Sequence, residues 1–238
     1  GSYTVPIRIL RIHMEEDAAK MVHVGGAEGR ITAAAESLVD YNRCGTPLIE
    51  LVTEPDLRTP EEARLFMEKL RQTFLTLGIS DCSLENGSMR CDGNVSLRRR
   101  GTTALGTKTE MKNINSFKAI ARAIAGEYRR QVELIEDGGQ VKQQTRRWDD
   151  NKESSHAMRS KEDAQDYRYF PEPDLVPIII SDEWIQEVKD RQPELRSEKL
   201  ERYKKEYDIP QYDAEILTNS KHMADIFEEA AAICGKPK

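Results

Sequence analysis

The sequence predicts an α+β protein in which a mixed, largely antiparallel sheet with flanking helices precedes an all-helical segment. Strand-like apolar runs fill the first part of the chain, two amphipathic helical patterns interrupt them, and only helical patterns follow residue 182. The 238 residues, 38 % of them hydrophobic, suffice for one sizeable core and a small second domain. We place the boundary near Gln192 and Pro193, which gives domains 1–192 and 193–238.

The first strands are predicted from short apolar runs. Residues 5–14 carry apolar side chains on both faces, so we expect a well-covered strand there. The stretch from Lys20 to Ala35 is rich in Gly and Ala and predicts a long loop. Strands are expected again at residues 37–42 and 47–53.

Two helices have clear sequence limits. Thr59 can cap the first, Pro60 suits its first turn, Glu62 completes a capping box, and Gly78 ends it. The second is predicted from Ser116 to about residue 137, where two glycines stop it. Its expected apolar stripe comprises Phe117, Ile120, Ile124, Tyr128 and Leu134 or Ile135.

The remaining elements follow from shorter patterns. We expect strands at residues 82–85, 90–97, 107–112 and 175–180. Helices are expected at residues 182–191, 194–207 and 220–234. Residues 149–166 are polar, until an aromatic and proline-rich string at residues 166–174 interrupts them.

Composition excludes several classes of protein. No apolar run approaches the roughly 20 residues that cross a bilayer, so we expect no membrane contact. The four cysteines lie far apart and form no C-x-x-C pair, which argues against a disulfide framework or a zinc site. The histidines also lack a metal-binding spacing. A reducing cytoplasm is the predicted compartment.

The net charge of −6 is unevenly distributed. Residues 88–160 contain fifteen Lys and Arg against nine Asp and Glu, a local excess of six positive charges. A basic segment in an acidic protein indicates an anionic partner such as nucleic acid or nucleotide phosphate. A solvated helix face balanced by nearby carboxylates explains the same pattern.

Three acidic residues lie in or beside strands that are predicted to be buried: Glu16, Glu50 and Asp92. Buried carboxylates are costly unless they are paired or hold a metal ion. Several on neighbouring strands would form an oxygen-rich site suited to Mg²⁺. Simple pairing with arginines such as Arg11 or Arg90 is the competing interpretation, and it is favoured for any one of them taken alone.

Eight short strings are distributed along nearly the whole chain. They are RIHMEED (11–17), VDYNR (39–43), GTPLIE (45–50), EPD (54–56), GSMRCDGNVSL (87–97), KNINSF (112–117), QTRR (144–147) and DYRYFPEPD (166–174). Together, and in this order, they resemble the B subunit of glutamine-dependent aspartyl/glutamyl-tRNA amidotransferase.

The resemblance implies a fold and an activity. It implies a cradle domain of the glutamine synthetase and guanido kinase type, followed by a helical domain and a small tail domain. The family's subunit phosphorylates, with ATP, the side-chain carboxylate of glutamate or aspartate on a misacylated tRNA. Ammonia from the glutaminase A subunit then displaces the phosphate, in a cytoplasmic heterotrimer that also contains a C subunit.

The resemblance also implies roles for particular residues. Glu16, Glu50 and Asp92 match positions that bind Mg²⁺, and Glu16 and Glu50 are the catalytic candidates. Glu16 further matches a residue proposed to gate or deprotonate incoming ammonium. A polar strand could line the ammonia channel or contact phosphate, although an ordinary exposed strand face explains it equally well. Its residues are Lys108, Glu110, Lys112 and Asn113.

The sequence departs from the family at both ends. By this resemblance we expect the chain to start inside the cradle domain, after the family's N-terminal strand with its metal ligands, and to stop before most of the helical domain and the tail domain. The resemblance is therefore to an internal part of the subunit, and we expect no firm binding of Mg²⁺ or ATP and no activity from this part alone. A non-catalytic tRNA-binding scaffold and a carboxylate kinase acting on a small molecule are the competing functions.

Overall fold

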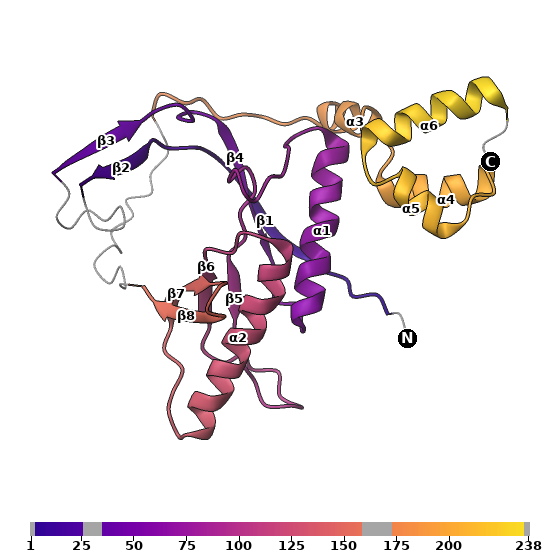
Figure 1. Cartoon of the computed structure of the whole chain (residues 1–238). Helices are drawn as coiled ribbons and strands as arrows, with labels where there is room; N and C mark the ends of the chain where they lie inside the picture. Colours follow the sequence, from indigo (N-terminus) through magenta and orange to yellow (C-terminus); the bar gives the residue numbers. More distant parts are fainter. Residues whose placement is uncertain (1–2, 26–34, 159–172, 236–238) are drawn as a thin grey trace. The chain divides into compact units, whose positions relative to one another are not determined.

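The computed structural model describes residues 3–25, 35–158 and 173–235. In these ranges it is a mixed α/β structure with three small sheets and six helices, consistent with the predicted α+β class (Figure 1). Its contacts divide the chain into two units, Gly1–Arg58 and Thr59–Lys238. Among the helices described, none is long and apolar enough to cross a membrane.

The first unit consists of two antiparallel strand pairs. Strand β1 (Ile9–Glu16) pairs with β4 (Pro47–Thr53), and β2 (Lys20–Val24) pairs with β3 (Glu36–Asp40). The bounds of β4 are those that the sequence predicts. A bidentate ion pair from Arg8 to Asp56 joins the segments flanking β1 and β4, at 2.7 Å between Nη2 and Oδ1.

Two predictions for this unit are wrong. The expected loop begins with a strand, because the apolar residues of β2 face Val39 and Leu38 across a regular antiparallel register. Gly25, at φ +80°, ends β2 in a conformation that favours glycine. The first strand is not covered either: every residue of β1 is exposed, and pairing with β4 supplies its hydrogen bonds.

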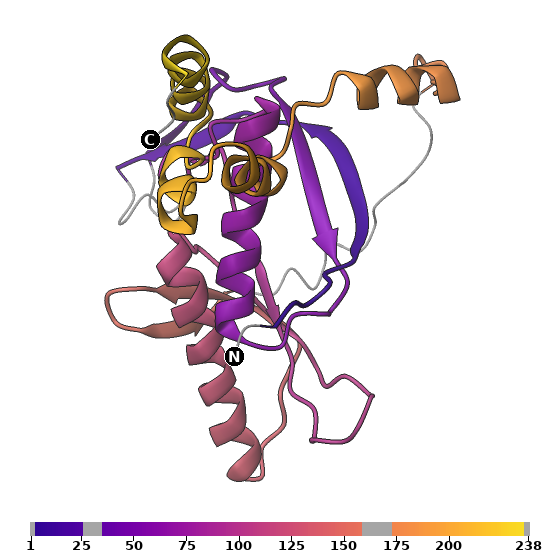
Figure 2. The same ribbon diagram turned by 90° about the vertical axis from the view of Figure 1, so that its right-hand side faces the viewer.

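A four-stranded sheet is the centre of the second unit. Its order is β5 (Gly93–Val95), β6 (Thr109–Lys112), β7 (Gln144–Asp149) and β8 (Ser154–Ala157), with β6 and β7 parallel and the other pairs antiparallel. Helix α2 (Phe117–Glu136) connects the two parallel strands and packs against the sheet (Figures 1 and 2).

The prediction of this sheet is only partly correct. Strands β5 and β6 are shorter than expected, and residues 82–85 form no strand, since a turn spans residues 84–87. There Ser80 and Ser83 accept hydrogen bonds from the backbone at Cys82 and Asn86, and such local bonds compete with a strand ladder. Strands β7 and β8 were not predicted, because their arginines and serines resemble a polar loop.

The two long helices confirm the predicted limits. Helix α1 (Pro60–Leu77) begins with the Thr59 capping box and ends at Gly78 in the left-handed conformation. Ser116 caps α2, as predicted. The predicted apolar stripe of α2 is partly wrong: Tyr128 and Ile135 are exposed. The buried side chains of α2 are Ala119, Ile120, Ala123, Glu127 and Gln131.

The C-terminal segment is helical, as predicted. It comprises α3 (Asp182–Asp190), α4 (Arg196–Glu206), α5 (Gln211–Leu217) and α6 (Lys221–Cys234), of which α5 was not predicted. The predicted strand at 175–180 is wrong, since these residues are extended and exposed but lack a ladder partner among the residues described. Most of the predicted aromatic string, residues 166–172, lies outside the described ranges.

Candidate functional site

The four-stranded sheet has one face buried under α2 and one polar face. Thr109 and Met111 of β6 are fully buried, so the alternation of the strand turns Glu110 and Lys112 to the opposite side. We call this side the polar face. Register and side-chain contacts assign to it Asp92, Asn94, Glu110, Lys112, Thr145, Arg147 and His156.

Ion pairs and hydrogen bonds cross the strands on the polar face. The Lys112 ammonium lies 2.8 Å from Asp92 Oδ2 and 3.5 Å from Glu110 Oε1. The Thr145 hydroxyl donates to Glu110 Oε2 at 2.7 Å. The hydrogen bond to Asp92 and the charge of Glu110 raise the pKa of Lys112 above its ordinary value. This face therefore holds a fixed positive charge between two carboxylates.

Sequence reasoning missed two cationic or titratable residues of the polar face. Arg147 lies opposite Lys112 in the parallel register of β6 and β7, and His156 lies opposite Arg147 on β8. Both side chains are exposed. The alternation around Trp148, an aromatic residue in a polar run, is the signal that could have identified β7 and hence the side on which Arg147 lies.

The other two residues of the predicted polar strand lie outside β6. Asn113 follows the strand with φ +68°, and its side-chain amide donates to the backbone carbonyl of Trp148 at 2.9 Å. That bond joins the end of β6 to β7. Lys108 precedes β6 and is exposed. The structure thus brings together Asp92, Glu110 and Lys112. The side chain of Asn113 instead joins β6 to β7 through its hydrogen bond to the Trp148 carbonyl.

Glu16 and Glu50 both lie in the β1–β4 pair, but on different sides of it. Glu50 is opposite His13, whereas Glu16 is opposite Pro47. Residues directly opposite one another share a face, and the face alternates at each residue. Because three positions separate His13 from Glu16, Glu16 and Glu50 point to opposite faces of this pair. The strand pairing does not bring the two carboxylates together.

A metal site remains a prediction. Glu16, Glu50 and Asp92 supply carboxylate oxygens, which are the ligands that Mg²⁺ prefers. Within residues 3–25, 35–158 and 173–235, no three His, Cys, Asp or Glu side chains gather closely enough to hold a metal ion. Asp92 already accepts from Lys112, so a metal ion at Asp92 would compete with that ammonium.

The four-stranded sheet thus has one face buried under α2 and one face of paired ionic groups. Comparison with known proteins identifies the family. The chain belongs to the GatB/GatE catalytic-domain family, whose model matches residues 2–186.

Several curated relatives are similar over nearly the whole chain. A protein of Agathobacter rectalis is 66 % identical over 98 % of this chain and 47 % of its own length. Proteins of Lachnoclostridium phytofermentans and Carboxydothermus hydrogenoformans are 60 % and 52 % identical over the same shares. All three carry the name of the B subunit of an aspartyl/glutamyl-tRNA(Asn/Gln) amidotransferase. The chain spans about half the length of these relatives.

Proposed function

We propose that the chain forms part of the catalytic domain of a tRNA-dependent amidotransferase, in its B subunit. The observation that carries this proposal is the family match over residues 2–186, together with relatives that bear this name. In the proposed reaction ATP phosphorylates the side-chain carboxylate of glutamate or aspartate on tRNA, and ammonia displaces the phosphate. A glutaminase A subunit and a C subunit would complete this cytoplasmic enzyme, and the A subunit would supply the ammonia.

The polar face supports a role in handling phosphate. A carboxylate is a poor electrophile until phosphorylation converts one oxygen into a leaving group. Lys112 offers a positive charge to a transferred phosphoryl group, while Asp92 and Glu110 hold its ammonium in place. Mg²⁺ would neutralise charge on the phosphates of ATP, and if it bound at Asp92 it would replace the Lys112 ammonium as the partner of that carboxylate.

The opposite orientations of Glu16 and Glu50 support separate roles for them. One carboxylate at the mouth of an ammonia channel can accept a proton from ammonium, which must be neutral before it attacks. We assign this role to Glu16, at the end of β1, and metal binding to Glu50, within β4. Each role needs an ionised carboxylate exposed at the strand surface, and both residues are exposed.

The test is Glu16→Gln in the full-length subunit assembled with its partners. Gln keeps the size of the side chain and removes its charge and basicity, so amidation should fall by about 10²- to 10⁴-fold. Glutamine hydrolysis should continue at least in part, because that chemistry belongs to another chain. The measurements are conversion of Glu-tRNA and release of glutamate, in parallel.

Glu36→Gln is the matched control, since Glu36 is an exposed carboxylate on β3 in the same unit. It should leave both rates near those of the wild type. Normal amidation by Glu16→Gln would remove Glu16 from the mechanism. If both activities fell equally, a defect in folding or assembly would be the better explanation, and a thermal melt of the complex would detect it.

A non-catalytic tRNA-binding scaffold remains the second candidate function. It is favoured by the exposed run of Arg98, Arg99 and Arg100 in the basic segment. Arginines there could contact phosphate without any chemistry. Glu16→Gln distinguishes the two functions, because a scaffold would tolerate it and a catalytic domain would not. Reversing the charge of Arg99 and Arg100 would weaken tRNA binding whichever function is correct.

A further inference from the structure

Behind the polar face, a buried ionic cluster joins α2 to the sheet. It consists of Thr109, Glu127, Arg130, Gln131 and Arg146. The Glu127 side chain is fully buried and accepts two hydrogen bonds from Arg130, at 2.8 and 2.6 Å. Gln131 is also fully buried and donates to Glu127 at 2.8 Å.

The cluster reaches every strand of the sheet. The Gln131 amide nitrogen lies 3.1 Å from the Val95 carbonyl on β5 and 3.4 Å from the Thr109 hydroxyl on β6. On β7, Arg146 Nε lies 3.7 Å from Glu127. The same guanidinium donates to the hydroxyl and the carbonyl of Ser155 on β8, at 2.8 and 2.7 Å.

The cluster is costly in free energy. A buried ion pair carries a desolvation penalty that apolar side chains of similar volume avoid, so it is weak evidence for stability. Moreover, the side-chain amide oxygen of Gln131, Oε1, is buried without a hydrogen-bond partner among the residues described. An unpaired buried carbonyl destabilises the fold further. A cluster retained at such a cost indicates a role in geometry.

Hydrogen bonds can supply that geometry because they constrain distance and direction, whereas apolar contacts tolerate sliding. The strands that the cluster holds on one face carry the candidate site on the other. Thr109 immediately precedes Glu110, and Arg146 lies between Thr145 and Arg147. A shift of β6 relative to β5 or β7 would therefore alter both the Lys112–Asp92 and the Thr145–Glu110 contacts.

We propose that this buried cluster is a positioning device that sets the relative placement of the strands carrying Asp92, Glu110 and Lys112. Its residues act through the strands and do not contact the reactants. The expected effect of this cluster on catalysis rests on the proposed function. The placement of the strands can be measured whether or not the protein has that function.

The experiment uses the full-length subunit in its assembled complex. Thr109→Val keeps the shape and removes the hydroxyl that lies 3.4 Å from the Gln131 amide nitrogen, so it takes away a side-chain contact between α2 and β6. Thr109→Ser keeps the hydroxyl and is the rescue variant. Tyr203→Phe is the matched control, because Tyr203 is an equally buried residue that donates to a carboxylate, Glu228, within the helical segment.

Two measurements decide the proposal. Hydrogen–deuterium exchange should become faster at residues 109–112 in Thr109→Val, return to the wild-type rate in Thr109→Ser, and be unchanged there in Tyr203→Phe. The kcat for amidation should fall about tenfold to a hundredfold in Thr109→Val, because small misplacements are costly in catalysis. Glutamine hydrolysis should continue in Thr109→Val. Tyr203→Phe should keep kcat within about twofold of the wild type, although it should lose about as much thermal stability as Thr109→Val.

Unchanged hydrogen–deuterium exchange at residues 109–112 in Thr109→Val would overturn the proposal. So would an equal fall of kcat in Thr109→Val and Tyr203→Phe at an equal loss of thermal stability, because the effect on kcat would then reflect stability alone. An inactive wild-type complex would instead refute the proposed function. In that case the exchange measurement alone would still decide whether the cluster positions the strands.

Discussion

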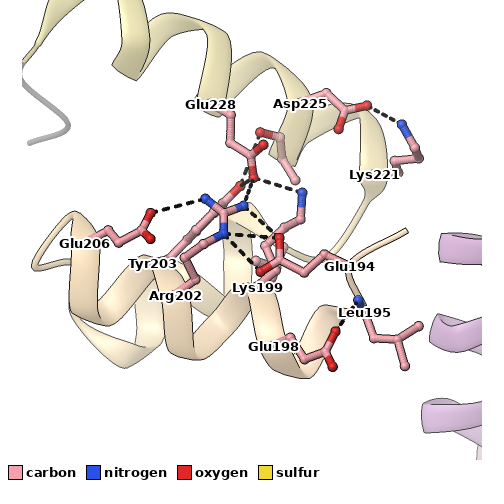
Figure 3. Close-up of polar contacts among 12 residues, drawn as sticks. Glu194, Leu195, Glu198, Lys199, Arg202, Tyr203, Glu206, Lys221, Asp225 and Glu228 are labelled. Carbon is pink, nitrogen blue, oxygen red and sulfur yellow. Dashed lines mark hydrogen bonds and ion pairs between the residues drawn. The ribbon is translucent and has the colours of Figure 1, made fainter. Parts of the chain in front are cut away.

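Two carboxylates in ionic clusters, Glu127 on α2 and Glu228 on α6, form similar contacts in different surroundings. Each accepts hydrogen bonds from an arginine and from a neutral side chain. The side chain of Glu127 is 0 % exposed and its partners extend to the sheet, whereas that of Glu228 is 29 % exposed. The partners of Glu228 are Lys199, Arg202 and Tyr203, all on α4 (Figure 3).

The helical segment has a second source of stability beside its ionic cluster. The rings of Tyr203, Tyr207 and Phe227 pack against one another with centroids 5.0–5.4 Å apart. They adjoin the buried Ile209 and Ala224. The comparison indicates that the same charged groups can fix strands under a candidate site or merely reinforce an aromatic core. Substitutions should separate these roles by the size of their effects.

The largest effect is expected for Glu127→Gln. It leaves Arg130 and Arg146, which are 27 % and 13 % exposed, without a carboxylate partner in the part of the chain that the structure describes. Breaking one side of a buried pair should cost about 3–5 kcal/mol. Urea denaturation of the wild type and the variant measures this loss. A loss below that of Glu228→Gln would contradict the comparison.

Gly126→Ala should destabilise the α2 layer by about 2 kcal/mol. A Cβ at Gly126 would lie 2.7 Å from a ring carbon of the buried Trp148, and overpacking of this kind outweighs the helix propensity gained from alanine. Gly93→Ala is the control, because its nearest atoms lie at 3.8 Å, in ordinary contact. Calorimetry of both variants should show the larger fall in Tm for Gly126→Ala.

Glu228→Gln should cost about 1–2 kcal/mol at neutral pH, since the site is partly screened by solvent and the aromatic core remains. Burial opposes the charge of Glu228, but hydrogen bonds from Lys199, Tyr203 and Arg202 outweigh it and lower its pKa to about 2, from an ordinary value of 4.5. The folded state therefore favours the ionised form. Its contribution is present above pH 4.5 and is lost as the pH falls to about 2.

Urea denaturation as a function of pH tests this sign. The stability difference between the wild type and Glu228→Gln should shrink as the pH falls from 4.5 towards 2. A difference that grew on acidification would show that Glu228 is not held in its ionised form by α4.

The smallest and most uniform effects are expected at the helix caps. Ser116 and Ser220 accept from backbone amides at the starts of α2 and α6, at 3.0 and 3.2 Å. Replacing either by Ala should cost about 1 kcal/mol, because a cap acts on its own helix. Equal losses in thermal melts would show that the two regions differ in their ionic clusters and not in helix initiation.

The sequence predicts local signals better than long-range packing. The capping box at Thr59 and the limits of α2 depend on neighbouring residues, and they are confirmed. The burial of Glu127 and Gln131 could not be read from the pattern, because it depends on the small Ala119 and Ala123 that let α2 lie close to the sheet. Leu175 and its apolar neighbours suggest a strand, but composition does not supply a ladder partner.

The candidate site shows the same limit. Glu110 and Lys112 could be predicted from their alternation with Thr109 and Met111. The opposite orientations of Glu16 and Glu50 could not be predicted, because they depend on the register between β1 and β4. A resemblance to a family does not give that register.

The four-stranded sheet and its covering helix lie within one uninterrupted stretch, from Gly93 in β5 to Ala157 in β8. Every side chain of the buried cluster comes from this stretch. Contacts at short sequence separation form quickly, and during synthesis the N-terminal parts of a chain fold first. The layer that carries the polar face can therefore assemble on the ribosome before α4 and α6 have been translated.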